Sequence, residues 1–482
     1  MDLKVAQRIV GLLLMGFAVT LTLPLAFSLY DRDGLYIEWV DSMLITAALG
    51  LMLWYTARGG RDQLRLREAY VVVTGFWFSV SLAGALPFFL TMAPFISFTD
   101  AVFESTSGLT TTGATVLSSL DALPRSILFY RHLLQWFGGM GVVLLGIAVL
   151  PLLGVGGMAL YAAETPGPVK DAKLAPRIGQ TARSLWVVYL GLTVLCAGAY
   201  WGLGMSGFDA VGHALSTIST GGFSSHDASF DYFQSAAIEL AATVFMLASG
   251  LNFALHYTAW WRGKPKVFLE DPETKLYFRL FWIVTAFSIF GLIVTSQETP
   301  LLAARHALFT VSSVITSTGF TTVNFSLWPG MLPALLIFLS MIGGCGGSTA
   351  GGMKCMRFYL IFKQLRWEVV KVIHPTALPA VMISGRKVDN QIVRSVWGFF
   401  FVYATVYVII MLGLLATGLD EVSAFSAVAA TINNLGPGLG EVASSFASVS
   451  DAGKWLSAFA MVLGRLEIFT ILVLLMPEFW RA

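Results

Sequence analysis

Charged residues are scarce in this chain of 482 residues, of which only 12% are charged and 56% are hydrophobic. Soluble globular chains carry about 25% charged residues, so the composition excludes an ordinary soluble enzyme, a disordered chain and a coiled coil. The 30 lysines and arginines nearly balance the 28 aspartates and glutamates, which leaves no basic excess for a nucleic-acid partner. The composition therefore predicts a chain that lies in a lipid bilayer.

Cysteines and catalytic motifs are also scarce. Cys196, Cys345 and Cys355 are not spaced as a metal or redox pair, and the chain has no P-loop or dinucleotide-binding fingerprint. Six polar residues in or beside apolar runs form no metalloprotease motif and no carboxylate pair: Glu104, His213, Glu239, Asn252, His256 and His306. We expect no enzymatic activity and no organic cofactor, and we expect these side chains to be hydrogen-bonded inside a helix bundle.

Long apolar runs are plentiful, and a membrane-spanning helix needs about 20 such residues. Ten runs are long enough: 9–29, 38–56, 70–92, 128–153, 184–204, 235–261, 277–296, 332–362, 396–417 and 455–477. Shorter segments rich in small residues lie near 100–112, 208–220, 304–318 and 421–434. These segments are too short to cross a bilayer and predict half-helices buried within the protein.

The positive residues predict the orientation of the chain. One set of alternate loops holds 24 lysines and arginines, and Arg465 lies inside an apolar run. The opposite set holds five: Arg32, Arg125, Arg131, Arg305 and Lys454. Because cytoplasmic loops carry the excess of positive residues, both termini are expected in the cytoplasm. The half-helices then lie on the outer side of the membrane.

One plan occurs four times after the first two spans: a full span, a half-helix that ends in a glycine-containing tetrapeptide, and another full span. The tetrapeptides are Thr111-Thr112-Gly113-Ala114, Ser219-Thr220-Gly221-Gly222, Ser317-Thr318-Gly319-Phe320 and Asn434-Leu435-Gly436-Pro437. Successive glycines of the set Gly113, Gly221, Gly319 and Gly436 are 108, 98 and 117 residues apart. A period near one hundred residues predicts a pseudo-symmetric assembly.

The half-helices carry the signals of helix starts. Asp100, Asp209 and Asp420 are predicted N-caps, and Thr299 precedes a proline suited to the first helical position. Each half-helix would point its partially negative C-terminal end into the membrane, so four ends around one axis would form a cation site made of backbone carbonyls. Glycine in one such segment is explained by close helix packing alone, but four copies at the same place favour the cation site.

A second glycine-rich segment interrupts the run 332–362. Between Gly343 and Gly352, seven of ten residues are glycine or alanine, a composition that does not maintain a regular helix. Irregular backbone at membrane depth must be covered by protein or line a cavity, which predicts a flexible plug below the cation site. A simple packing seam is the alternative. A charge in mid-span faces the protein interior, so Arg465 is expected to contact this plug. The alternative is that Arg465 pairs with Glu467 or with a carboxylate of another repeat and only holds the bundle together.

With these motifs the chain resembles the TrkH/KtrB/HKT superfamily of potassium transporters over its whole length. The resemblance is carried by the four tetrapeptides, by the stretch from Gly343 to Lys354, by Gly464-Arg465-Leu466-Glu467, and by two extra N-terminal spans. It implies an all-α polytopic membrane protein with four pseudo-symmetric helix–pore loop–helix repeats, in a bacterial cytoplasmic (inner) membrane. The expected units are 1–66 (two N-terminal helices), 67–160, 180–263, 274–373 with a gating loop at 343–352, and 390–482.

The resemblance also implies which residues act. Potassium, the transported ion, would be held by backbone carbonyls of the filter, around Thr111, Thr112, Gly113, Thr220, Gly221, Thr318, Gly319, Leu435 and Gly436. In this superfamily a serine in place of the first filter glycine is associated with sodium, so glycine in all four repeats favours potassium. The implied gate consists of Gly343, Gly346, Gly347, Ser348, Thr349, Gly351, Gly352 and Arg465. The fourth tetrapeptide departs from the Ser/Thr pattern.

Partners are likewise implied by the resemblance. They are membrane lipid, a second copy in a homodimer that uses the broken helix of the third repeat, and a cytosolic nucleotide-binding ring regulator of the TrkA type. The basic loops 154–183 and 363–395 would dock this regulator. A coupled secondary transporter is the alternative function, although inverted repeats would be expected there, whereas these four repeats run in the same sense. Passive and coupled transport stay open.

Overall fold

The computed structural model describes residues 3–59, 64–92, 95–149, 178–376, 381–383, 386–388 and 390–481. The predicted all-α fold is confirmed, and the strands in these ranges are the short antiparallel pair β1 (Met382–Ile383) and β2 (Arg386–Lys387). The basic loop predicted at 154–183 lies outside the described residues up to residue 177, as does the end of the expected span 128–153.

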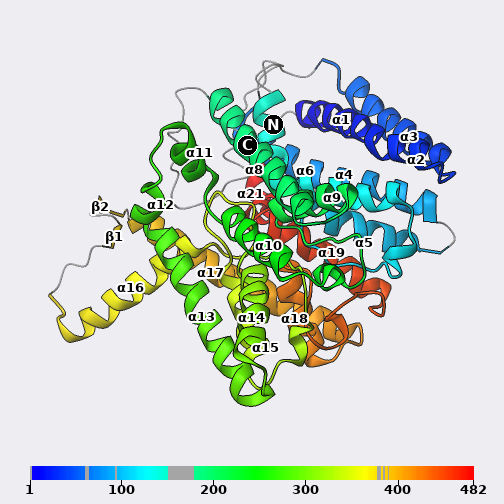
Figure 1. The fold of residues 1–482 in the computed structure, drawn as a ribbon. Helices are drawn as coiled ribbons and strands as arrows, with labels where there is room; N and C mark the ends of the chain where they lie inside the picture. Colours follow the sequence, from blue (N-terminus) through cyan, green and yellow to red (C-terminus); the bar gives the residue numbers. More distant parts are fainter. Residues whose placement is uncertain are drawn as a thin grey trace.

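Three helices form the N-terminal unit at one edge of the molecule (Figure 1). They are α1 (Leu3–Thr20), α2 (Thr22–Asp31) and α3 (Tyr36–Thr56). Gly11 and Gly50 allow α1 and α3 to touch through their backbones, because a Cβ on Gly11 would lie 2.6 Å from the Gly50 carbonyl oxygen. Small residues at such a crossing are the usual means by which membrane helices approach closely.

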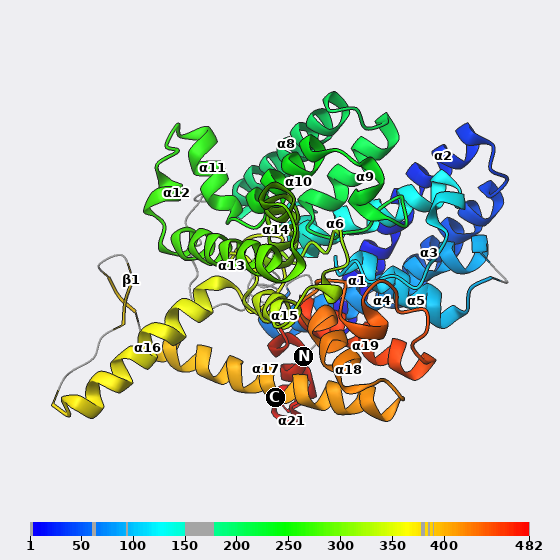
Figure 2. The ribbon, with the colours of Figure 1, turned by 60° about the horizontal axis from the view of Figure 1, so that its bottom comes forward.

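Four helical repeats follow. The first contains α4 (Leu66–Met92), α5 (Phe98–Leu109), η1 (Leu120–Ala122) and α6 (Arg125–Val149). The second contains α8 (Ile178–Gly202), α9 (Gly207–Ile218), η2 (Ser229–Phe233), α10 (Ala236–Ser249) and α11 (Phe253–Trp261). The short α12 (Val267–Glu270) leads to the third, with α13 (Pro272–Ser296), α14 (Pro300–Ile315), η3 (Phe325–Leu327), α15 (Leu332–Ile342) and α16 (Cys355–Ile373). The fourth contains α17 (Asn390–Ala416), α18 (Glu421–Ile432), η4 (Gly440–Val442), α19 (Asp451–Arg465), α20 (Phe469–Leu475) and α21 (Pro477–Trp480). Figure 2 shows the repeats following one another around the molecule in chain order, from α5 through α9 and α14 to α18.

Several spans differ from the expectation of ten. In the described residues, six helices are long and apolar enough to cross a membrane, and two sharply bent pairs raise the number to at most eight. The bent pairs are α10 with α11, at 99°, and α19 with α20, at 108°, so 235–261 and 455–477 are not straight spans. The run 332–362 is divided into α15 and α16 by the glycine-rich loop, and α6 is kinked at Gly141.

Long helices on the outside of the molecule expose large apolar side chains. Val194 on α8, Phe290 on α13 and Phe401 on α17 are 62%, 66% and 72% exposed. The four short helices α5, α9, α14 and α18 are instead buried over most of their length. Apolar side chains therefore lie on the outside, and the ends of the short helices lie inside, as suits a protein surrounded by lipid.

The predicted helix starts need correction at two of four places. The N-caps of α5 and α9 are Ser97 and Ser206, whose side chains accept from the backbone N–H groups of Asp100 and Asp209. Both aspartates lie three residues inside the cap, and Asp100 completes a capping box with Ser97. Asp420 is the N-cap of α18 as predicted, and Pro300 is the first residue of α14 after Thr299.

Candidate ion pathway

The four short helices end in the same backbone conformation. Beyond the last helical residue, one residue caps the helix and the next adopts the left-handed conformation, with φ of 55°, 53°, 49° and 52° at Thr111, Thr220, Ser317 and Asn434. Two positions later a glycine follows, with φ of 79°, 80°, 82° and 96° at Gly113, Gly222, Gly319 and Gly436. This identity of conformation makes the four segments structurally equivalent.

The equivalence corrects the predicted position of the second glycine. Gly222, not Gly221, matches Gly113, and Gly221 occupies the position of Thr112, Thr318 and Leu435. Two adjacent glycines permit either alignment when the sequence is read alone. The backbone of the neighbouring repeats decides between them.

Hydrogen bonds close each helix end. The N–H groups of Thr112, Gly221, Thr318 and Leu435 donate to the carbonyl five residues earlier, at 2.9, 2.8, 2.8 and 2.8 Å. This is the Schellman closure, in which glycine normally occupies the left-handed position. Here that position holds threonine, serine or asparagine, at a cost on the order of 1–3 kcal/mol for each residue. The surrounding packing maintains this strained backbone at the site.

The four equivalent segments meet in a closed ring. A Cβ added to Gly113 would lie 2.2 Å from the Gly221 oxygen, and one added to Gly222 would lie 1.9 Å from the Thr318 oxygen. The same holds for Gly319 against the Leu435 oxygen, at 2.1 Å, and for Gly436 against the Thr112 oxygen, at 2.6 Å. Each glycine therefore accommodates the carbonyl of the following repeat, and the fourth repeat closes onto the first.

Cavities border this ring. One, of about 170 Å³, is lined by all four glycines together with residues that follow them, such as Ser224 and Phe446. Another, of about 190 Å³, is lined by the glycine-rich loop, Arg465 and Asn434. The first cavity therefore lies against the ring glycines, and the second lies against the glycine-rich loop.

The glycine-rich loop is fastened directly beneath the ring. The Thr349 hydroxyl donates to the carbonyl of Ile218, the last residue of α9, at 3.0 Å. The N–H of Gly351 donates to the Ser317 hydroxyl at 2.8 Å, and a Cβ on Gly351 would lie 2.0 Å from the Asn433 oxygen. The loop thus touches the helix ends of the second, third and fourth repeats.

Arg465 contacts the loop as the sequence predicts. Its Nη1 donates to the Thr349 carbonyl at 3.1 Å, and its Nη2 donates to the Gly138 carbonyl and to the Gly139 carbonyl, the latter at 3.0 Å. Glu467, the alternative partner considered for this arginine, forms an ion pair with Arg357. The guanidinium therefore bridges the loop and α6.

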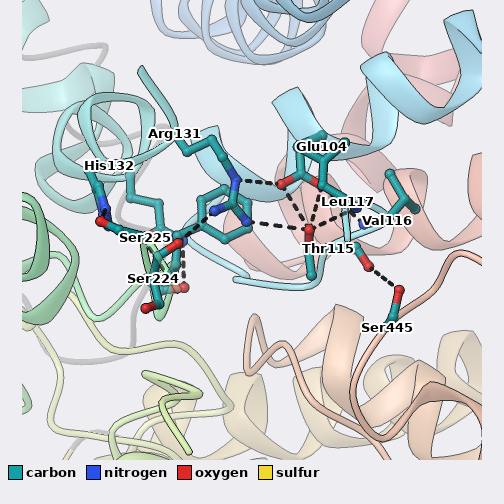
Figure 3. Close-up of polar contacts among 12 residues, drawn as sticks. Glu104, Thr115, Val116, Leu117, Arg131, His132, Ser224, Ser225 and Ser445 are labelled. Atoms are coloured by element: carbon teal, nitrogen blue, oxygen red, sulfur yellow. Dashed lines mark hydrogen bonds and ion pairs between the residues drawn. The ribbon is translucent and has the colours of Figure 1, made fainter. Parts of the chain in front are cut away.

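A buried ion pair beside the ring was missed by the charge count along the sequence. Arg131, counted among outer residues, lies on α6 and is paired with Glu104 on α5 at 2.8 Å, with side chains 1% and 0% exposed. Figure 3 shows Arg131 reaching both Glu104 and the Ser224 carbonyl, to which it donates at 2.7 Å. Glu104 in turn accepts from Thr115. The sequence contains a signal for this buried charge, because Arg131 lies inside the expected span 128–153.

The other polar residues confirm the prediction that they are hydrogen-bonded. His213 is bonded to Ser224, Glu239 to Arg305, Asn252 to the N–H of Ala254, His256 to the Ala248 carbonyl and His306 to Glu298. In the described residues, no group of three or more histidine, cysteine, aspartate and glutamate side chains could hold a metal ion.

These features define a class of membrane protein in which four pore-loop repeats of one chain surround a single axis. A sequence model described as "TrkH: Cation transport protein" matches residues 38–481, and the chain belongs to this family. The chain is 50% identical to the Trk system potassium uptake protein TrkH of Vibrio parahaemolyticus, over 100% of both chains. It is 38% identical to the Trk system potassium uptake protein TrkG of Escherichia coli, over 99% of both. The crystal structure of the potassium transporter TrkH from Vibrio parahaemolyticus superposes with a TM-score of 0.91 at 47% identity, covering 100% of each chain.

Proposed function

We propose that this chain takes up potassium across the bacterial cytoplasmic membrane as the translocating subunit of a Trk-type system. Full-length relatives named as Trk system potassium uptake proteins support this assignment. The observation that carries it is the closed ring in which the carbonyls of Thr112, Gly221, Thr318 and Leu435 alternate with four glycines. Such carbonyls replace the hydration shell of a potassium ion.

The proposed filter uses the register of the structure. Its backbone comes from Thr111–Gly113, Thr220–Gly222, Ser317–Gly319 and Asn434–Gly436. The ends of four short helices add partial negative charge at the same place, each on the order of half an elementary charge. A cation is therefore stabilised without a carboxylate in the path.

The proposed gate is the loop from Gly343 to Gly352 together with Arg465. The loop lies against the helix ends below the ring, and the fixed positive charge of Arg465 opposes the passage of a cation. Opening requires the loop to move aside and the bond between Arg465 and the Thr349 carbonyl to break. Other loop anchors differ in kind: the N–H of Cys345 donates to the Gly250 carbonyl at 2.9 Å, and the N–H of Gly346 donates to the Glu273 carboxylate at 2.8 Å.

The proposed assembly is a homodimer bound by a cytosolic nucleotide-binding ring of the TrkA type, with both termini in the cytoplasm. The relatives' description as parts of a Trk system supports a regulatory partner. The two ends of the described chain lie near each other in both views (Figures 1 and 2), which suits termini on one side of the membrane.

Rubidium uptake into proteoliposomes tests this function. Purified protein should accumulate rubidium when the vesicles hold potassium, and external potassium should compete better than sodium. Uptake that follows the potassium gradient alone identifies a channel, and dependence on a proton or sodium gradient identifies coupled transport. Equal competition by sodium and potassium would contradict a potassium filter.

A further inference from the structure

One position of the proposed filter lacks a side chain in the second repeat. At the position before each ring glycine, the other repeats carry Thr112, Thr318 and Leu435, whereas the second carries Gly221. The hydroxyls of Thr112 and Thr318 are hydrogen-bonded to those of Thr110 and Thr316, at 2.8 and 2.7 Å. These bonds tie Thr112 and Thr318 to the C-caps of α5 and α14, and Gly221 has no side chain with which to form such a bond.

Gln135 occupies the space that is free at Gly221. A Cβ added to Gly221 would lie 2.4 Å from Gln135 Cδ and 2.5 Å from its Oε1. Gln135 belongs to α6, which contacts α9 closely, and it is fully buried. The amide therefore stands where a side chain of residue 221 would otherwise be.

The amide of Gln135 clamps the backbone on both sides of Gly222. Its Nε2 donates to the Gly221 carbonyl at 2.6 Å, and its Oε1 accepts from the N–H of Phe223 at 3.0 Å. A carbonyl oxygen has two lone pairs, so the Gly221 oxygen keeps one for an ion in the ring. Gly222 is the ring glycine that accommodates the Thr318 carbonyl, so this clamp fixes two neighbouring carbonyl positions.

Gln135 is one of several α6 residues that brace the second repeat from the same face. Arg131 lies one turn before it and donates to the Ser224 carbonyl at 2.7 Å. Gly139 lies one turn after it, and a Cβ there would be 2.5 Å from Ser219 Cβ. The amide of Gln135 is thus held in place by a helix that packs tightly along the whole pore segment.

We propose that Gln135 is a positioning residue that determines the ion preference of the filter. It supplies from α6 the support that a threonine side chain supplies in the first and third repeats. This inference rests on the proposed potassium function. Preference between potassium and sodium depends on the positions and number of the carbonyl ligands. An unsupported Gly221 carbonyl is free to follow a smaller ion, and the preference for potassium falls.

Two variants test the clamp. Gln135→Glu keeps the volume and the acceptor for Phe223 but removes the donor to Gly221, while Gln135→Leu removes both. The ratio of rubidium to sodium uptake should fall about tenfold in each, since a lost buried hydrogen bond changes an equilibrium by roughly that factor. The matched control is Gln7→Leu, because Gln7 on α1 also donates from Nε2, to Thr56 at 2.7 Å and to Leu53 at 3.3 Å. That control should keep the wild-type ratio.

A compensating pair separates support from mere stability. Gly221→Thr alone should impair uptake, because its side chain would collide with Gln135. The double variant Gly221→Thr with Gln135→Ala should recover the preference, since threonine is the residue of the first and third repeats.

The outcomes distinguish the two proposals. A wild-type protein without preference for potassium would overturn the proposed function. The role of Gln135 would be overturned by a different result. In that result the wild type prefers potassium, and the rubidium-to-sodium ratios of Gln135→Glu and Gln135→Leu lie within about twofold of the wild-type ratio at equal amounts of folded protein. Failure of the double variant to exceed Gly221→Thr would do the same.

Discussion

In each of the four equivalent segments, a glycine lies where the carbonyl of the next repeat leaves no room for a Cβ. The left-handed residues two positions earlier are not glycine, although their φ values are near 50°, so conformation alone does not explain the choice of residue. The explanation is the close approach, with a Cβ distance of 2.6 Å or less at each ring glycine. Gly222 and Gly34 allow the two effects to be separated.

Gly222→Ala should abolish selective uptake. A Cβ would lie 1.9 Å from the Thr318 oxygen, a rigid backbone atom of the neighbouring segment, so the ring must open. Gly34→Ala is the control, because Gly34 has a φ of 83° but no atom within 4 Å of an added Cβ. It should cost about 1 kcal/mol of backbone strain and leave rubidium uptake selective. Selective uptake by Gly222→Ala would show that the ring glycine is elsewhere.

Arg465→Ala should raise ion leak through the closed protein. Removal of the guanidinium frees the Thr349 carbonyl and removes the positive charge below the ring. We expect roughly tenfold more rubidium flux in proteoliposomes without an activating partner, the equivalent of about 1.4 kcal/mol. Deletion of residues 346–351 should act in the same direction.

Arg125→Ala provides the comparison for charge removal. Its side chain is 60% exposed and lies 3.8 Å from Asp31, so its loss should leave the leak unchanged. Leak at the wild-type level in both Arg465→Ala and the loop deletion would contradict the gate.

At the scale of whole elements, the sequence predicts the short helices well and the bends poorly. Residues 421–434 were expected as a half-helix and α18 spans Glu421–Ile432, because capping and composition act over a few neighbouring residues. The bends that follow Ser249 and Arg465 depend on contacts with other repeats, and the apolar run continues through both. Two other features likewise depend on residues that are distant in the sequence. They are the pairing of Arg131 with Glu104, 27 residues apart, and the register at Gly221 and Gly222.

His226 ties the loop that follows Gly222 to the first repeat. This side chain is an ion-pair partner of Asp121, which lies in η1, and its Nε2 lies 3.3 Å from Asp209 Oδ1. Its ring stacks on Tyr232 with centroids 3.4 Å apart. Burial acts to lower the pKa of His226, but the two carboxylates outweigh it, so the pKa is raised above the usual value.

Stability should therefore depend on pH through His226. A raised pKa in the folded state means that the contribution is fully present below the unfolded value of about 6.5 and is lost as pH rises through the folded pKa. In detergent, the wild type should have a higher Tm than His226→Gln at about pH 6. This difference in Tm should shrink as the pH increases to about 9. His306→Gln serves as the control, because His306 also pairs with a carboxylate, Glu298, but lies on α14. A constant difference between wild type and His226→Gln at every pH would exclude the charged pair.

At the scale of the whole molecule, the ring of repeats must close without a covalent link between the fourth repeat and the first. Polar contacts join the two repeats beside the aromatic contact of Phe103 with Phe446. The Asn434 amide donates to the Thr112 hydroxyl at 2.9 Å, and the N–H of Phe446 donates to the Thr115 carbonyl at 2.8 Å. Near the N-terminal ends of α19 and α5, Lys454 lies 2.7 Å from Asp100, with side chains only 8% and 21% exposed.

The ion pair of Lys454 with Asp100 should stabilise the closed ring. Lys454→Met and Asp100→Asn each break the pair, and asparagine retains an oxygen that can accept from Ser97. A double-mutant cycle on thermal stability should give a coupling of about 1–3 kcal/mol, and each single variant should also slow rubidium uptake because the ring loosens. The exposed pair of Lys371 with Glu368, with side chains 39% and 49% exposed, is the control and should couple by less than about 1 kcal/mol. If Lys454 and Asp100 couple no more strongly than that surface pair, this ion pair does not stabilise the closed ring.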